Sequence, residues 1–376
     1  MNIGFIEDTI LHGGTQLWVN EAMHAFLERG HEVTLLAPEG SWIVKQNADS
    51  GAAIFTYVWD DVVHEAEEHV QIWTSALSQS DVALCTVHPP RKGFHCSVFA
   101  ARCIKMAGLQ TYLIPKTGTI VPDYERRFYR PDETINSTVI AIAEFTRRYL
   151  FKTYEIPEKS ITLIYQGVDT ERFRSTSEGQ KEARRRYRLT ETAAPVLASV
   201  GSFEHRKGHP VLFEAVSWLA TGPMPDIHLM LVGDGPDEAL LLKRREELGL
   251  GNHITFFPFT SEPNFVFERT DITVLPSLNK EGLPNVLQES MAMNVPVVSS
   301  NIGGVPEVVF EGQTGYMAEP GSSEQLAEAI LKLWSDQEAY QQMRIHSRKL
   351  ILERFDKHKQ FDRFLAYFQD IVSKRS

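Results

Sequence analysis

Short apolar runs alternate with helix-period segments along the first half of the chain. The runs fall at residues 3–6, 32–37, 82–87, 111–114, 138–142 and 161–165, and most are followed by amphipathic stretches such as 15–29. Strands that are apolar throughout are buried on both faces, which is typical of parallel sheets covered by helices. The pattern predicts β-α-β units in this half.

The alternation stops over the polar residues 173–195, which include Arg184, Arg185 and Arg186, and predict a linker with a surface helix. It then restarts, with strands expected at 196–200, 228–232, 254–257, 272–275 and 295–299, and helices at 210–220, 238–248 and 284–293. We therefore expect an α/β chain of two doubly wound, Rossmann-like domains, 1–172 and 173–356, facing each other across a cleft. Ligands in such sheets bind beyond the carboxyl ends of the strands.

Composition narrows the class of protein. The length of 376 residues exceeds what one core usually supports, and 43% hydrophobic with 23% charged residues is ordinary for a globular protein. A net charge of -11 argues against nucleic acid as a partner. The chain has three cysteines, and its first segment reads as a strand rather than as a signal peptide. No apolar stretch approaches the ~20 residues needed to span a membrane. We therefore expect a cytoplasmic protein with at most peripheral contact at the inner membrane face.

Three glycine-containing loops follow predicted strands. Gly13 and Gly14 would let the backbone approach a ligand, although a plain strand-to-helix turn explains them equally well. In the loop from Gly201 to Gly208, Arg206 and Lys207 could meet a diphosphate, and a solvated basic turn is the alternative. The third loop, Gly233-Asp234-Gly235-Pro236, matches a dinucleotide fingerprint only in part, because Glu238 stands where the third glycine belongs.

The segment 275–292 carries the most specific pattern. A predicted strand ends at Pro276, a loop follows, and Pro284 suits the first turn of a helix. The amides of Gly282, Leu283, Asn285 and Val286 would then face an anion over the helix start and stabilise a leaving diphosphate without a metal.

Two glutamates flank this helix start. Glu281 and Glu289 are eight residues apart, which corresponds to about 12 Å along a helix. This exceeds the roughly 5–9.5 Å between the carboxylates of glycoside hydrolases, so we interpret them as separate hydroxyl clamps. The alternative is a helix cap and a solvated helix glutamate.

In their order, these motifs resemble the retaining nucleotide-sugar glycosyltransferases of family 4, which have the GT-B fold. The resemblance covers almost the whole chain and includes Gly13-Gly14-Thr15, 142–146, 167–173, Arg206-Lys207-Gly208, 233–236, Pro276-Ser277, the Glu281-to-Glu289 element, 303–307 and 312–315.

The resemblance implies roles for these positions. Lys207, Arg206 and Glu281 would be catalytic, with the two cations on the leaving diphosphate. The donor would be bound by Gly14, Ser202, Gly233, Phe259, Glu281, Gly282, Leu283, Pro284, Asn285, Val286 and Glu289, with Glu289 on the ribose hydroxyls. Gly13, Thr15, His88, Lys116 and Thr117 are acceptor-side candidates, and a final helix over 357–376 would return to the first domain.

The chain departs from the family pattern at two places. Ser202 stands where many relatives have an arginine, so Arg206 would substitute for it. Many relatives also have a histidine after the strand 111–114, where this chain reads Ile114-Pro115-Lys116-Thr117-Gly118. Either Lys116 or Thr117 would take that role, and a cation there hints at an acidic or unusual substrate.

Two further patterns receive structural interpretations. His88, His95, Cys96 and Cys103 lack the paired spacing of a zinc site, so no metal is expected. The basic-aromatic stretches 126–130 and 147–152 could meet an anionic lipid surface or a phosphorylated acceptor, but solvated helix faces with buried rings are favoured.

The expected activity is retaining, metal-independent transfer of a hexosyl group from a UDP- or GDP-sugar to a hydroxyl acceptor, in polysaccharide or glycoconjugate biosynthesis, with no cofactor. Two alternatives remain open: a disaccharide phosphorylase on the same fold and a non-catalytic nucleotide-sugar-binding protein. A nicotinamide oxidoreductase is the weakest alternative, because the fingerprint is incomplete.

Overall fold

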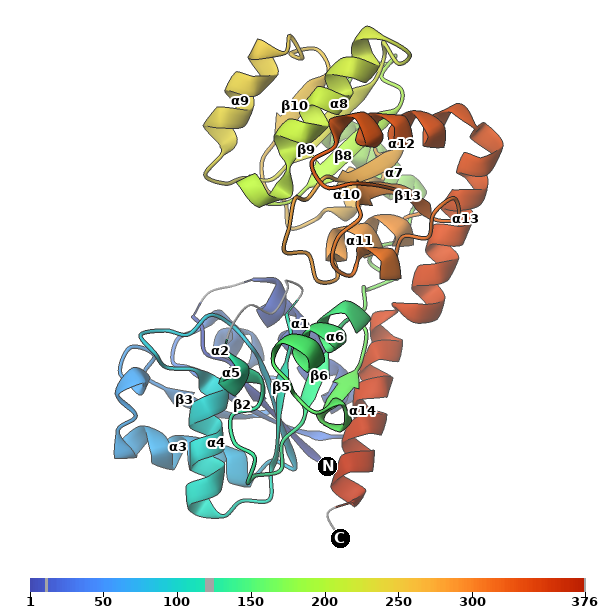
Figure 1. The fold of residues 1–376 in the computed structure, drawn as a ribbon. Helices are drawn as coiled ribbons and strands as arrows, with labels where there is room; N and C mark the ends of the chain where they lie inside the picture. The colour runs from blue at the N-terminus through green and yellow to red at the C-terminus, as the bar shows by residue number, and fades with distance from the viewer. Residues whose placement is uncertain (11–12, 119–124, 375–376) are drawn as a thin grey trace. The chain divides into compact units, whose positions relative to one another are not determined.

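The computed structural model describes residues 1–10, 13–118 and 125–374. Contacts divide the chain into two units, Met1–Tyr165 with His358–Ser376, and Gln166–Lys357 (Figure 1). The expected boundary after residue 172 thus lies after residue 165, because the strand-like segment around Val168 pairs with Asp356.

Unit 1 contains a seven-stranded parallel sheet in the order β3-β2-β1-β4-β5-β6-β7. Its strands are β1 (Asn2–Ile6), β2 (Glu32–Pro38), β3 (Ala53–Tyr57), β4 (Val82–Thr86), β5 (Tyr112–Lys116), β6 (Val139–Ala141) and β7 (Ile161–Leu163). Separate apolar clusters lie on the two faces, one including Phe5 and Phe26 and the other Trp73 and Phe99. Burial of both faces explains why most strands read as continuous apolar runs.

Helices cover both faces of this sheet: α1 (Gly14–Glu28), α2 (Trp42–Asn47), α3 (Glu67–Ser78), α4 (Cys96–Ala107), α5 (Arg126–Tyr129), α6 (Glu144–Thr153) and α14 (Lys357–Ser373), with 3-10 turns at Val62–His64 and Glu158–Ser160. α14 packs on α1, where Trp18 Nε1 donates to Gln360 Oε1 at 3.1 Å and the Trp18 and Phe364 rings are 5.4 Å apart. The final helix therefore returns to unit 1, as expected. Residues 375–376 of the expected range lie outside the described residues.

Unit 2 contains a six-stranded parallel sheet in the order β10-β9-β8-β11-β12-β13. Its strands are β8 (Val196–Val200), β9 (His228–Val232), β10 (Ile254–Phe257), β11 (Ile272–Leu275), β12 (Val297–Ser300) and β13 (Gly315–Ala318). The helices are α7 (Ser177–Arg186), α8 (His209–Thr221), α9 (Glu238–Glu247), α10 (Asn264–Phe267), α11 (Asn285–Ala292), α12 (Ser323–Ser335) and α13 (Gln337–Arg354), with 3-10 turns at His205–Lys207 and Val305–Glu307.

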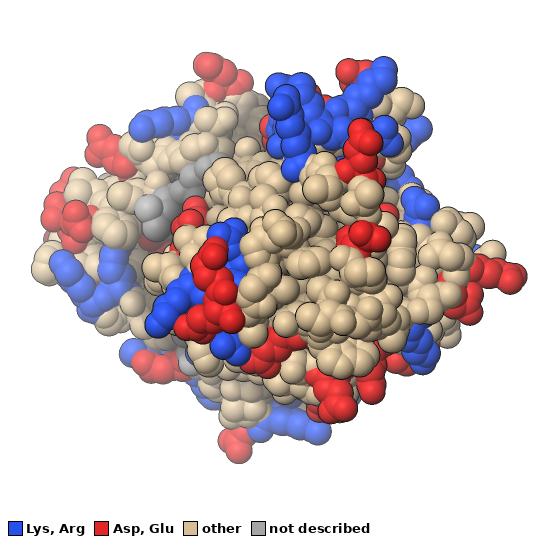
Figure 2. All heavy atoms as spheres, turned by 90° about the horizontal axis from the view of Figure 1, so that it is seen from above, with Lys and Arg blue, Asp and Glu red and all other residues tan. Residues whose placement is uncertain are grey.

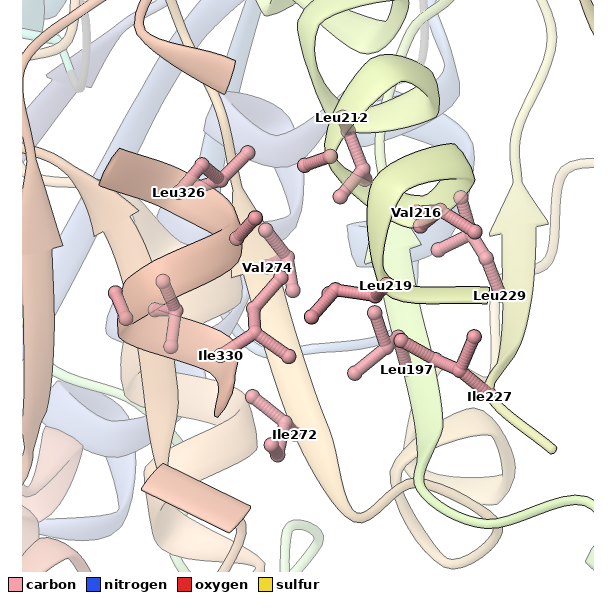
Figure 3. Packing of buried hydrophobic residues seen from close by; sticks show 14 of the residues in the cluster. Leu197, Leu212, Val216, Leu219, Ile227, Leu229, Ile272, Val274, Leu326 and Ile330 are labelled. Carbon is pink, nitrogen blue, oxygen red and sulfur yellow. The ribbon is translucent and has the colours of Figure 1, made fainter. Parts of the chain in front are cut away.

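The core of unit 2 is built from the sheet and the helices α8 and α12. Leu212, Val216 and Leu219 of α8 and Ile330 of α12 point toward Val274 and its neighbours on the strands (Figure 3). The fully buried strand and helix side chains hold the carboxyl ends of β8, β9 and β11 in fixed positions, which is where the loops of interest begin.

The two doubly wound sheets predicted from the sequence are confirmed, with two missed strands. Both β3 and β13 are at the edge of a sheet. β3 is largely half-exposed, and β13 is short and starts at Gly315. Pro284 was expected inside a helix, but it is extended (ψ 119°) and α11 begins at Asn285.

Candidate functional site

Four loops at the carboxyl ends of unit 2's strands are joined by backbone hydrogen bonds. Leu278 N donates to Arg206 O at 2.8 Å, Gly304 N to Gly282 O at 2.7 Å, and Phe203 N to Asp234 O at 2.6 Å. These bonds connect the loops that follow β8, β9, β11 and β12. Ser202, Arg206, Lys207, Gly233, Glu281 and Gly282 therefore lie in loops that are bonded to one another.

Close backbone approach explains the glycines of this layer. A Cβ at Gly208 (φ +67°) would lie 2.0 Å from Pro276 O, and one at Gly233 would lie 2.0 Å from Gly201 O. A Cβ at Gly303 (φ +57°) would lie 1.7 Å from Glu281 O. These distances exclude any side chain, and the positive φ values favour glycine.

The carboxylate of Glu281 is the centre of a polar cluster. Its Oε1 accepts hydrogen bonds from Lys207 Nζ at 2.7 Å and from Ser277 Oγ at 2.7 Å, and Arg206 Nη1 lies 3.6 Å away. Only 4% of the Glu281 side chain is exposed, against 14% for Lys207 and 23% for Arg206. The three expected catalytic residues are therefore in direct contact, and Glu281 holds Lys207 in place.

Arg206 has a second partner, because its Nε donates to Glu204 Oε2 at 2.7 Å. The hydrogen bond and charge of Arg206 help to lower the pKa of Glu204, against an opposing effect of burial that is the largest single influence. Ser202 lies at the start of the same loop, half-buried. The expectation that Arg206 substitutes for an arginine at position 202 stays a prediction.

The start of α11 presents free backbone donors. The amides of Leu283, Asn285 and Val286 donate to no acceptor within the described part of the chain, and no acidic residue occupies the first turn. Lys280 is left-handed (φ 62°), which turns the loop just before Glu281. Free amides at a helix start favour an anion.

Glu289 lies on α11, half-buried and separate from the Lys207 cluster. Burial raises the pKa of Glu289 to about 7, against smaller opposing effects of Arg172 and Lys357. Its carboxylate makes no hydrogen bond or ion pair with any residue that the structure describes. A carboxylate without a partner is suited to accept hydroxyl hydrogen bonds from a ligand.

Phe259 follows β10 and is 69% exposed. The neighbouring loop starts at Gly233, whose amide donates to Phe257 O at 3.0 Å. An aromatic ring with so much exposed surface at the carboxyl end of the sheet offers a face on which a nucleobase can stack.

In unit 1 the acceptor-side candidates lie over the ends of β1, β4 and β5. Lys116 Nζ sits 4.2 Å from the centre of the Trp18 ring, and burial lowers the pKa of Lys116 to about 7. Glu7 Oε2 accepts from Gln16 Nε2 at 2.7 Å, and burial raises the pKa of Glu7 to about 8. The interior of this site therefore holds two titratable groups near neutrality.

Thr117 is fully buried, and its hydroxyl accepts from the Ile142 amide at 3.1 Å. Lys116 is only 4% exposed. Both side chains expected to replace the family histidine are thus enclosed by unit 1 in this structure. Of the two side chains, that of Thr117 already forms the hydrogen bond that fixes the backbone just after β6.

A cavity of about 380 Å³ adjoins these residues, lined by Asp8, Thr9, Gly13, Gln16, Trp59, His88, Pro89, Arg91 and Phe94. Burial lowers the pKa of His88 and raises that of Asp8. Gly13 lies at the cavity, whereas a Cβ at Gly14 would meet nothing within 4 Å, and Thr15 is half-buried in the first turn of α1. The cavity can hold a group of the size of a sugar ring.

Other candidate residues have structural roles. His95 caps α4 through the Ser97 amide and stacks on Phe128, with ring centres 4.2 Å apart. No group of His, Cys, Asp or Glu in the described ranges is arranged to bind a metal ion. Arg147 and Arg148 pair with Glu144, as expected of a solvated helix face.

No helix in the described ranges has both the length and the apolar character needed to cross a membrane.

Sequence reasoning missed Glu7, Ser277 and Arg91. Glu7 follows β1 directly, so a charged residue at the end of an apolar strand was the available signal. Ser277 was noted only as part of a motif, although it donates to Glu281. Arg91, whose guanidinium lies 3.7 Å from the Trp59 ring centre, gave no signal in the sequence.

Part of the chain is similar in sequence to known glycosyltransferases. Residues 180–350 match the family model described as "Glycosyl transferases group 1". The N-acetyl-alpha-D-glucosaminyl L-malate synthase of Bacillus anthracis is 27% identical over 225 residues, covering 59% of this chain and 57% of the relative. A GDP-mannose-dependent alpha-(1-6)-phosphatidylinositol monomannoside mannosyltransferase of Mycobacterium tuberculosis is 30% identical over 208 residues, covering 53% of each. The chain thus spans little more than half the length of these relatives.

Solved structures extend the likeness over the whole chain. A glycosyltransferase from Rickettsia africae superposes with a TM-score of 0.83 at 20% identity, covering 99% of this chain and 98% of the other. HepE from Anabaena, solved in complex with UDP, has a TM-score of 0.83 at 17% identity, covering 98% and 100%. At these identities the likeness establishes the fold, and it confirms the expected GT-B class.

Proposed function

We propose, from the match of residues 180–350 to the group 1 glycosyl transferases, that the chain transfers a hexosyl group from a UDP- or GDP-sugar to a hydroxyl acceptor. The single observation that carries this proposal is the contact of Lys207 with Glu281 beside Arg206 and the free amides of α11. Cations and amides gathered at one helix start suit a diphosphate leaving group.

The donor would occupy unit 2. Its diphosphate would lie over the amides of Leu283, Asn285 and Val286, its ribose at Glu289, and its base against Phe259. The nucleotide choice draws on relatives: one is named for GDP-mannose, and HepE was also solved with UDP-glucose. Polysaccharide or glycoconjugate assembly is the proposed setting.

Transfer would proceed without a metal and with retention of anomeric configuration. Lys207 and Arg206 supply positive charge where the leaving diphosphate gains negative charge, which is the task a divalent cation would otherwise perform. The proposal assigns Glu281 to positioning Lys207 rather than to covalent attack, because its carboxylate is ion-paired with Lys207 and accepts from Ser277. Attack from the face that the leaving group vacates is therefore the proposed route.

The test combines binding with product stereochemistry. Calorimetric titrations in EDTA with UDP, GDP and NAD should show binding of UDP or GDP and none of NAD. Slow hydrolysis of UDP-glucose or GDP-mannose, followed by NMR, should release first the anomer that the donor carried. Binding of NAD alone, a strict need for a divalent cation, or an inverted first product would overturn the proposal.

A further inference from the structure

A second candidate site lies at the amino-terminal edge of the unit 2 sheet, where its strands begin. This edge is opposite the one that carries Lys207 and Glu281. Arg269 and Asp271 precede β11, and Val295 precedes β12. Because the strands are parallel, this edge is a strand length away from the loops that hold Lys207 and Glu281. Whatever binds here does not touch the proposed donor site.

Two adjoining cavities open at this edge. The first, of about 390 Å³, is lined by Ser175, Gln180, Arg184, Phe267, Glu268, Arg269, Thr270, Asp271, Met293, Val295, Trp334, Gln337, Tyr340, Gln341 and Arg344. The second, of about 550 Å³, shares Arg184 and Arg269 and adds Arg188. The two shared arginines therefore stand between both spaces.

The two carboxylates that line the first cavity already accept hydrogen bonds from other residues of the protein. Glu268 Oε1 accepts from the Thr176 amide and its Oε2 from Ser175 Oγ, both at 2.7 Å. Asp271 Oδ2 accepts from the Val196 amide at 2.8 Å. Of the three arginines that line the first cavity, Arg344 donates to Asn294 O and Gln341 Oε1, which leaves Arg184 and Arg269.

The arginines, in contrast, are poorly paired. Arg184, Arg188 and Arg269 make no hydrogen bond or ion pair with a residue in the described ranges. On the same helix as Arg184, Arg185 and Arg186 both pair with Glu182. The face seen in Figure 2 carries side chains of both signs of charge. Arg184 and Arg269 thus lack the carboxylate partner that Arg185 and Arg186 have.

Arg269 is the group that most needs a counter-ion. It is half-buried, and burial lowers its pKa, with the nearby charge of Arg184 adding to the effect and Asp271 opposing it. Two guanidinium groups that repel each other, one of them partly desolvated, are stabilised when an anion binds between them.

Aromatic residues in the wall of the first cavity indicate which class of anion would bind between Arg184 and Arg269. Trp334 and Tyr340 pack edge to face, with ring centres 5.3 Å apart, and the Tyr340 hydroxyl donates to Asp271 O at 3.0 Å. Aromatic rings beside a fork of guanidinium groups suit a phosphate ester whose body packs on the rings.

We propose that this edge of unit 2 is a binding site for a phosphate monoester, with the phosphate between Arg184 and Arg269 and the ester body against Trp334. The ester could be free, as in a sugar phosphate, or the headgroup of an anionic lipid. Both sources offer the same dianion to the same arginines.

The experiment titrates the full chain with glucose 6-phosphate by calorimetry and, separately, with phosphatidylcholine vesicles containing phosphatidic acid. Saturable binding is expected in one arm, which identifies the source. Arg184→Gln with Arg269→Gln should weaken that binding by about ten-fold or more, since each lost charge-assisted contact is worth about that factor. Arg185→Gln, on the same helix, and Lys207→Ala should retain it.

Arg184→Glu serves as a second variant, because Arg184 is exposed and its replacement does not disturb packing. It too should weaken binding. Absence of binding in both arms overturns the proposal, as does unchanged affinity in the double variant, and loss of binding in Lys207→Ala would assign the ligand to the donor site instead.

Discussion

Lys207 Nζ lies 2.7 Å from Glu281 Oε1, although the two residues are 74 positions apart in the chain. Both side chains are largely buried, and Ser277 donates to the same carboxylate oxygen. A lysine held by a carboxylate in this way has a fixed position, which prepares it to contact a ligand phosphate.

The pair should be energetically coupled. Lys207→Ala leaves the Glu281 carboxylate buried with weaker compensation, whereas Lys207→Ala combined with Glu281→Gln removes both charges. We expect the double variant to lose less unfolding free energy than the two single variants lose together, by about 1–3 kcal/mol. Urea unfolding of the four proteins measures this difference, and additive effects would show that the contact is of no energetic consequence.

Gly303→Ala should disrupt the loop that carries Glu281, because the new Cβ would lie 1.7 Å from Glu281 O. We expect loss of UDP or GDP binding together with a lower melting temperature. Gly312→Ala is the matched control, since Gly312 has a similar φ of +71° but nothing within 4 Å of its added Cβ. If both variants bind nucleotide equally, the glycine does not shape the site.

Nucleotide affinity should rise with pH through the titration of Glu289. Its folded-state pKa of about 7 lies above the ordinary 4.5, so this group stabilises the fold at low pH and less as the pH rises toward 7. The ionised carboxylate accepts hydrogen bonds from two ribose hydroxyls more strongly than the protonated carboxyl group does. Calorimetric titration with UDP or GDP from about pH 6 to about pH 8 should show this rise, and a Glu289→Gln protein should lack that component. Parallel profiles for both proteins would exclude Glu289 from the ribose site.

Burial of Lys116 should make unit 1 more stable at alkaline pH. The pKa of Lys116 is lowered from 10.5 to about 7, so the unfolded chain binds the additional proton between these values and stability rises with pH. Urea unfolding at about pH 8 and about pH 10 should show a larger rise for the wild type than for Lys116→Met. The Glu7→Gln protein should retain the rise. An equal rise without Lys116 would mean that other groups cause it.

The alternation of apolar runs predicted both sheets because strands buried on two faces leave a clear signal. β3 and β13 were missed since edge strands need not be apolar on both faces, as the exposure of Ala53 and Thr56 in β3 illustrates. The helix start near Pro284 was predicted to within one residue, because proline leaves little choice there.

The residues of the candidate site were predictable, but their contacts were not. Glu281 and Glu289 were interpreted as two separate hydroxyl clamps, and the hydrogen bond between Lys207 and Glu281 was not predicted. That contact depends on the Arg206–Leu278 backbone bond and on Gly208 packing against Pro276, and a pattern along the chain contains neither. In the same way, burial is the largest cause of the pKa values of Lys116 and Glu7 near neutrality, and the extent of burial cannot be seen in the sequence.

The most direct test of the account is the rate of donor cleavage by Lys207→Ala in EDTA. With UDP-glucose or GDP-mannose, whichever the wild type turns over, the variant should lose about 2–4 kcal/mol of transition-state stabilisation, seen as a fall in kcat. Lys243→Ala, which removes an exposed lysine on α9, should leave kcat unchanged. A Lys207→Ala enzyme that turns over at the wild-type rate would contradict the claim that this lysine neutralises the leaving diphosphate.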